Sequence, residues 1–284
     1  MPTEATTTAL KSTSRRTEPT TTTHRQTLGR AIRSEWIKLR TLRSTWIGMG
    51  AVVLLLVGLG AIAAAVSTGS VTTPEEGGGF VNGDPLRTVL TGDFAVLLVG
   101  VLGALAGARE YGSRMILATI AAVPRRWQVV VSKVIVLTGV VLPTALIGVL
   151  AAFGVGMSIL SAGDSATVAL TDDGVLRKVL GMAGYLTAIA LMGLGLGILL
   201  RSVASSIGVL IGGVMVLPTL AGALLPASLD SVLQFLPSSA AAAFTTVRGA
   251  GDEVLGPTAG ALVLAAWVAV TLGASVLAIT RRDA

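Results

Sequence analysis

The chain of 284 residues contains no cysteine and a single histidine, His24. Without cysteine there is no disulfide framework, no thiolate nucleophile and no cysteine-ligated metal. One histidine in a polar tail excludes a zinc site built on histidines and a Ser-His relay within the membrane. We therefore expect no metal and no cofactor in this chain.

Charged residues are also scarce. They make up 13% of the chain, whereas about a quarter is usual in a soluble domain. Hydrophobic residues reach 52%, which is more apolar surface than a soluble globule of this size can hide. The composition excludes a soluble enzyme, a disordered protein and a coiled coil. It predicts an all-α, polytopic membrane protein, and the net charge of +6 does not by itself indicate a nucleic-acid partner, so none is expected.

Six stretches have the roughly 20 mostly apolar residues that a helix needs to cross a bilayer. They are residues 46–66, 89–108, 129–153, 179–200, 203–225 and 257–280. The second stretch has the shortest uninterrupted apolar core. Only Arg201 and Ser202 separate the fourth from the fifth, which predicts a tight helical hairpin. Pro143 and Pro218 are candidates for kinks in the third and fifth stretches.

The distribution of Lys and Arg predicts the orientation. With the N-terminus in the cytoplasm, seventeen Lys and Arg residues lie inside and four lie outside, while ten of the fifteen acidic residues lie outside. We therefore expect both termini in the cytoplasm and the chain in the cell membrane as a multi-pass protein. A cleaved signal peptide is the alternative for the first span, but its apolar run exceeds the roughly 7–15 residues of such signals.

Two different segments precede the first span. Residues 1–24 are Thr-rich and nearly free of apolar side chains, which predicts disorder. In residues 25–45 apolar side chains recur every three or four positions among basic ones, which predicts a basic amphipathic helix at the membrane interface. We assign Arg33, Glu35, Trp36, Lys38 and Arg40 to this interfacial helix. Two roles stay open for it, anchoring the first span and docking a partner.

The cytoplasmic loop over residues 109–128 carries the strongest functional signal. Its apolar patch at 115–123 is too short to cross a membrane, so it is expected to lie at the interface or to fit a groove on a soluble partner. Glu110 is the only acidic residue of the loop, and a carboxylate at a membrane boundary needs a partner. The candidate partners are Arg109, Arg114 and Arg125. The simpler alternative is a local salt bridge that turns the chain.

Together these features resemble the permease, or membrane subunit, of ABC-2-type ABC transporters of the actinobacterial style. The resemblance rests on the helix before the first span, on the six-span layout with a long outer loop at 226–256, and on one motif. That motif is Glu110-Tyr111 followed by Thr119, Pro124, Arg125, Arg126 and Lys133. Gly112 directly after Tyr111 departs from the turn usual in the family. For the outer loop, short helices on the membrane surface and a cap over a pathway both remain open.

The resemblance implies that the loop is a coupling element held in a cleft of a separate cytosolic ABC-type ATPase. It also implies a second permease chain, in a homodimer or a heterodimer. The coupling-loop residues are Glu110, Tyr111, Gly112, Arg114, Thr119, Pro124, Arg125 and Arg126. None of the four lysines follows a glycine, so the chain has no P-loop. We expect no enzymatic activity here and ATP hydrolysis in the partner.

The function predicted is export of a hydrophobic or amphipathic substrate. Ionisable residues are scarce within the predicted spans, and Asp93 lies near the end of one of them. This scarcity argues against transport driven by an ion gradient and against an intramembrane enzyme. The alternative from another class is a non-transporting membrane assembly or regulatory subunit that uses the same docking loop.

Overall fold

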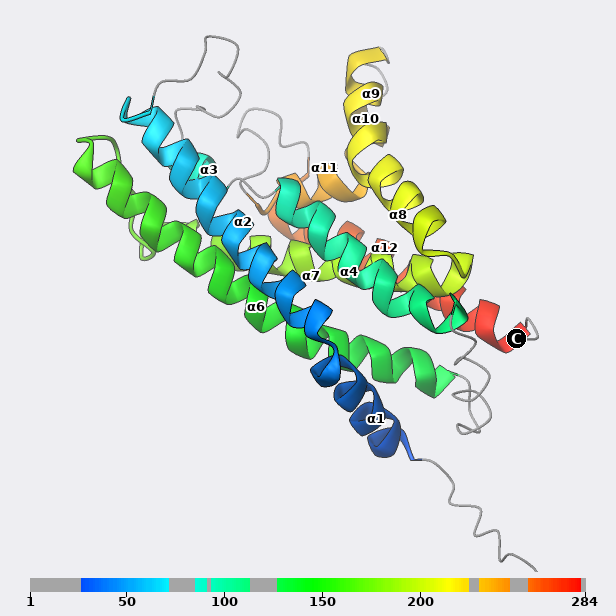
Figure 1. Ribbon diagram of the computed structural model, residues 1–284. Coiled ribbons are helices and arrows are strands. Elements are labelled where there is room, and N and C mark those ends of the chain that lie inside the picture. The colour runs from blue at the N-terminus through cyan, green and yellow to red at the C-terminus, as the bar shows by residue number, and fades with distance from the viewer. Residues whose placement is uncertain are drawn as a thin grey trace, which may run out of the picture.

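A computed structural model of the chain describes residues 27–71, 85–90, 93–112, 127–224, 230–245 and 255–281, and every regular element in these ranges is a helix (Figure 1). Six of the described segments are long and apolar enough to cross a membrane, which confirms the predicted all-α, six-span fold. They are α2 (Arg43–Ser67), α4 (Asp93–Gly112), α6 (Trp127–Ala162), α7 (Val175–Leu200), α8 to α9 (Val203–Leu224) and α12 (Pro257–Arg281). The Thr-rich tail at 1–24 lies outside the described residues.

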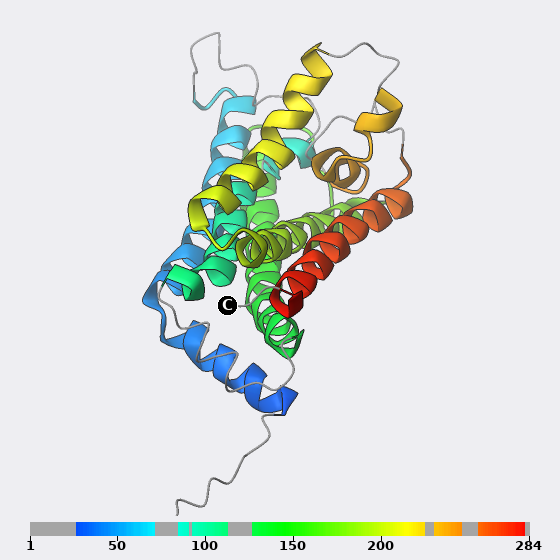
Figure 2. The ribbon, with the colours of Figure 1, turned by 90° about the vertical axis from the view of Figure 1, so that its right-hand side faces the viewer.

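Helix α7 is the centre of the bundle, in contact with α4, α6 and α12 (Figure 2). Met182, Leu186 and Ile189 on this helix are fully buried. Its closest neighbour is α4, because glycines on both helices let the two backbones approach. A Cβ atom on Gly103 would collide with the carbonyl oxygen of Ala190, and one on Gly193 with that of Gly100. Small residues are the usual means of close helix packing in membranes.

The fifth span is irregular in its middle. Helix α8 (Val203–Ile211) continues through a π-helical turn, η2 (Gly212–Val216), into α9 (Leu217–Leu224). The turn ends two positions before Pro218, whose ring lacks an N–H and clashes with the carbonyl four residues earlier in a regular helix. By contrast, α6 continues as one helix across Pro143.

A short helix packs into the end of the bundle opposite α1 (Leu28–Thr41) (Figures 1 and 2). Helix α3 (Pro85–Val89) buries Leu86 and Val89 against α2 and α6. The chain is therefore helical and buried where we expected the end of an outer loop and the start of the second span, which begins at Asp93 instead.

The predicted outer loop at 226–256 contains two more helices, α10 (Asp230–Leu233) and α11 (Pro237–Ala242). Ala240 and Ala241 are fully buried, and α11 packs against α12 and η2. The indole N–H of Trp267 on α12 donates to the carbonyl oxygen of Phe235 at 2.8 Å. This part of the loop therefore packs against the bundle through α11.

Candidate functional site

The site begins at an elbow between α1 and α2. Helix α1 ends at Thr41, Leu42 is extended, and α2 begins at Arg43. The elbow is braced by Trp46, whose indole N–H donates to the carbonyl oxygen of Arg40 at 3.2 Å. Because the chain bends here, α1 turns out of line with α2 (Figure 2) and packs against the first turns of α6.

The face of α1 that meets the bundle is not its apolar stripe. Ala31 and Glu35 are its buried residues, whereas Trp36 is 40% exposed. A carboxylate therefore points inward and a tryptophan outward. The outward tryptophan suits the membrane interface, where amphipathic aromatic rings gather. The inward carboxylate requires partners of opposite charge.

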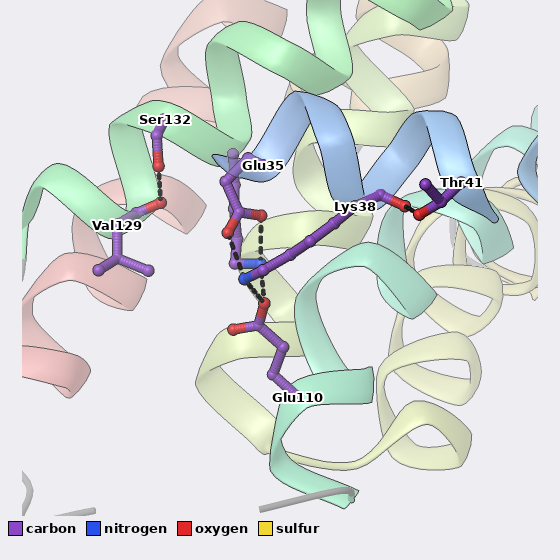
Figure 3. A network of polar contacts seen from close by, with 7 residues as sticks. Glu35, Lys38, Thr41, Glu110, Val129 and Ser132 are labelled. Carbon is purple, nitrogen blue, oxygen red and sulfur yellow. Dashed lines mark hydrogen bonds and ion pairs between the residues drawn. The ribbon is translucent and has the colours of Figure 1, made fainter. Parts of the chain in front are cut away.

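Those partners form what we call the four-charge cluster, made of Glu35, Lys38, Glu110 and Lys133 (Figure 3). The Lys38 ammonium lies 2.7 Å from Glu35 and 2.8 Å from Glu110. The Lys133 ammonium lies 2.8 Å from Glu35 and 2.9 Å from Glu110. Each ammonium thus contacts both carboxylates, and opposite charges alternate around the cluster. Figure 3 shows Glu35 and Lys38 reaching from α1 toward Glu110 on α4.

The cluster is largely removed from solvent. The exposed side-chain fraction is 7% for Lys133, 9% for Glu35 and 11% for Glu110. Lys38 is the most open member at 31%. Buried ions are tolerated only when they are paired and hydrogen-bonded, because desolvation costs several kcal/mol per ion. The double pairing of each ammonium supplies that compensation.

The charge state of Lys38 follows from the same contacts. Burial lowers the pKa of Lys38, but hydrogen bonds and Coulombic attraction from Glu110 and Glu35 outweigh it. The net pKa of Lys38 therefore lies above its ordinary value of 10.5. Its ammonium remains protonated throughout the physiological range.

Three helices that are distant in sequence meet in the cluster. Glu35 and Lys38 lie on α1, Glu110 lies in the last turn of α4, and Lys133 lies in the second turn of α6. Glu110 and Lys133 also flank residues 113–126 of the predicted coupling loop. The cluster therefore joins the two ends of that loop to each other and to α1.

A second contact ties the end of α4 to another helix pair. The guanidinium of Arg201 lies 5.3 Å from the ring centroid of Tyr111, within the range of a cation–π interaction. Arg201 connects α7 to α8 and adopts a left-handed backbone with φ of 54°. Non-glycine residues rarely adopt this conformation, so the backbone of the connection is strained at Arg201.

Glu110 contacts residues that sequence reasoning did not propose. The structure shows Lys38 and Lys133 among its partners, 72 and 23 positions away. Glu35 and Lys38 of the predicted interfacial helix join the cluster, while Arg33 and Arg40 are exposed. Of the predicted coupling-loop residues, Tyr111 is half-buried and Gly112 ends α4. Arg114, Thr119, Pro124, Arg125 and Arg126 lie outside the described residues.

Two features of the sequence could have indicated the contacts within the four-charge cluster. Glu35 and Lys38 are three positions apart, which places them on one face of a helix. Lys133 lies inside an apolar run, where a lone cation needs a carboxylate.

The fold and the cluster define a multi-pass helical membrane protein whose first helix is tied by buried charge to two of its spans. Comparison with protein families gives the narrower assignment: the profile of the ABC-2 family transporter protein matches residues 31–219, more than half of the chain. The chain belongs to this family. The matched region contains all four members of the cluster. No curated protein matches the chain. The ABC-2 permease family is a membrane transport component, and its members generally work with an ATPase subunit.

Proposed function

We propose that the chain is the permease subunit of an ATP-driven ABC-2-type exporter. It moves a hydrophobic or amphipathic substrate out of the cell, and a separate cytosolic ATPase supplies the energy. A second permease chain, identical or homologous, completes the transporter. Membership of the ABC-2 family supports a role in transport, and the details of the proposal rest on the observations that follow.

The distribution of charge supports an orientation with both termini in the cytoplasm of a cell-membrane protein. Seventeen Lys and Arg residues fall on the proposed inner side and four on the outer side. The positive-inside rule favours this arrangement over its inverse. The four-charge cluster then lies at the cytoplasmic end of the bundle, on the side from which an ATPase would act.

The observation that carries the proposal is the position of the four-charge cluster. Glu110 and Lys133 flank residues 113–126 of the loop, and both bind α1 through Glu35 and Lys38. A force applied to the loop by an ATPase would therefore reach α4, α6 and α1 together. The Tyr111–Arg201 contact extends the same connection to α7 and α8. We propose that this is the route by which ATPase closure moves the spans.

The interior of the described spans supports a hydrophobic or amphipathic substrate. Two buried hydroxyl groups there are bonded to their own helices. Thr187 donates to the carbonyl oxygen of Ala183, and Ser275 donates to that of Leu272. These groups are therefore occupied locally and do not form a polar track across the described bundle.

The test begins with the tagged chain, extracted from its host membranes in a mild detergent and analysed by mass spectrometry. The proposal predicts recovery of a P-loop ATPase, and of ATP-dependent export once the complex is placed in liposomes. A preparation without an ATPase, under conditions that keep other membrane complexes intact, would favour the non-transporting subunit instead.

A further inference from the structure

A cavity of about 430 Å³ lies between α1, α2, α4 and α6, next to the four-charge cluster. Its volume is within the range of sites that hold small molecules, roughly 300–1,000 Å³. One part of its wall is charged and includes all four cluster residues and Arg109. Another part is apolar and is formed by Met49, Leu102, Leu105, Ala106 and Leu137.

The polar and apolar parts are separated along the helices. On α4, Leu102 precedes Glu110 by eight positions, about 12 Å along the helix axis at 1.5 Å per residue. On α2, Met49 likewise lies beyond the elbow, deeper in the span. The tryptophans Trp36, Trp46 and Trp127 are 39–50% exposed near the same end of the bundle, as expected at the membrane surface. The cavity thus runs from the headgroup level into the hydrocarbon region.

The charged wall favours an anionic group. Its two carboxylates are already shared by two ammonium groups, and Arg109 adds a further positive charge, so the lining carries a net charge of +1 at neutral pH. Arg109 is exposed and donates to the hydroxyl of Ser44 at 3.4 Å. A guanidinium carries five N–H donors, and its planar geometry suits a phosphate. Lys38, the most exposed member of the cluster, lines the same cavity.

We propose that this cavity binds one anionic phospholipid from the adjacent leaflet. Its phosphate contacts Arg109 and Lys38, and one acyl chain lies against Leu102 and Leu105. Such a lipid bridges the elbow of α1 and α2 to α4 and α6. The leaflet is the cytoplasmic one if the orientation proposed above holds, but binding itself requires neither an ATPase nor transport.

The test uses the purified, delipidated full chain in detergent and native mass spectrometry. Phosphatidylglycerol is the anionic probe. Phosphatidylcholine with the same tails tests the need for net negative charge, and glycerol phosphate tests the headgroup without tails. We expect phosphatidylglycerol to bind in a one-to-one complex, at least about tenfold more tightly than either comparison compound, the difference expected for about 1.4 kcal/mol.

Two variants locate the site. Arg109→Gln removes the phosphate contact, and Ala106→Phe fills the apolar part of the cavity. Both are expected to weaken phosphatidylglycerol binding by roughly tenfold, Arg109→Gln because it loses a charge-assisted contact and Ala106→Phe because its ring occupies the space of the acyl chain. Arg177→Gln, at an exposed position at the other end of the bundle, is the matched control and should bind normally.

Equal binding of phosphatidylcholine, equal binding of glycerol phosphate, or wild-type affinity in both site variants would overturn the proposal. Because no ATPase is present in the assay, these results leave the export proposal untouched. Conversely, failure to find an ATPase would not alter the lipid measurement.

Discussion

Glu110 and Lys133 lie 23 positions apart, at the ends of α4 and α6 that flank the coupling loop, and their charged atoms are 2.9 Å apart. Lys38 contacts the same oxygen of Glu110 at 2.8 Å from α1. The contact between the loop ends is therefore held in place by a helix that precedes the first span. This relationship leads to specific expectations for stability and for coupling.

Removing the buried cation should be costly. Lys133→Met leaves Glu35 and Glu110 with Lys38 as their only partner among the cluster residues. Removing one partner of a buried ion pair typically lowers the unfolding free energy by about 3–5 kcal/mol. Thermal unfolding in detergent measures the loss, with Lys178→Met at the far end of the bundle as the matched control. Equal stability of the two variants would contradict the pairing.

Charge exchange gives a sharper test because the cluster alternates in sign. Exchanging only two members, Glu110→Lys with Lys133→Glu, sets the new cation against Lys38 and the new carboxylate against Glu35. This double variant should be no more stable than Lys133→Met. Reversing all four charges, with Glu35→Lys and Lys38→Glu added, restores the alternation and should recover part of the lost stability. Full recovery by the two-residue exchange would show that α1 takes no part in the cluster.

The pH dependence follows from Lys38. A pKa that is raised in the folded state gives a stabilisation that is complete below the unfolded value and is lost as pH rises through the folded value. Because its ordinary pKa is 10.5, the contribution of Lys38 should be constant from about pH 6 to 9 and should fall only at higher pH. Melting temperatures across this range, compared with those of Lys38→Met, provide the measurement. If the melting temperature of the wild type has already fallen by pH 8 and that of Lys38→Met has not, the assignment of a raised pKa to Lys38 is contradicted.

Helix packing provides an independent prediction. Gly103→Ala places a methyl group against the carbonyl oxygen of Ala190 and should force α4 away from α7. Overpacking of this kind costs roughly 1–3 kcal/mol. Gly184→Ala on α7 meets no atom within 4 Å and should be neutral or slightly stabilising in the same unfolding assay. If both substitutions behave alike, the close approach of the two helices is not needed for stability.

The coupling loop can be tested apart from the stability of the cluster. Arg125→Glu reverses a charge in the loop and leaves all four residues of the four-charge cluster unchanged. It should weaken retention of the ATPase during purification while membrane insertion and thermal stability stay normal. Glu110→Ala should weaken coupling as well, but with a loss of stability. Normal export by both variants would remove the coupling role from this loop.

Much of the fold could be predicted because hydrocarbon imposes a simple length rule on apolar helices. The six spans and the all-α class follow from that rule alone. Their ends do not, because backbone hydrogen bonding can continue a helix beyond the length that a bilayer requires. Helix α6 thus reaches Ala162, beyond the predicted end at 153. Helix α3 was missed because five helical residues are too few to show a period.

The candidate site was only half predictable. Glu35, Lys38, Glu110 and Lys133 were all singled out, since charged residues in an apolar sequence attract attention. Their mutual contacts depend on the bend at Leu42, which brings α1 against α6 and places Lys38 beside a residue 72 positions away. No spacing rule encodes such a bend. The lining of the cavity depends on the same bend and could not be predicted from the sequence either.

We propose that the four-charge cluster makes α1, α4 and α6 move as one unit when the ATPase acts. Because the chain has no cysteine, spin labels can be attached to Ile37→Cys on α1 and Trp127→Cys on α6 without background. Both positions are exposed. In the complex with its ATPase, the distance between these labels should be the same without nucleotide and with ATP. When Lys133→Met is added, the distribution of distances between the labels should broaden or shift on binding nucleotide. A distance that changes with nucleotide in the otherwise unaltered chain would contradict the claim.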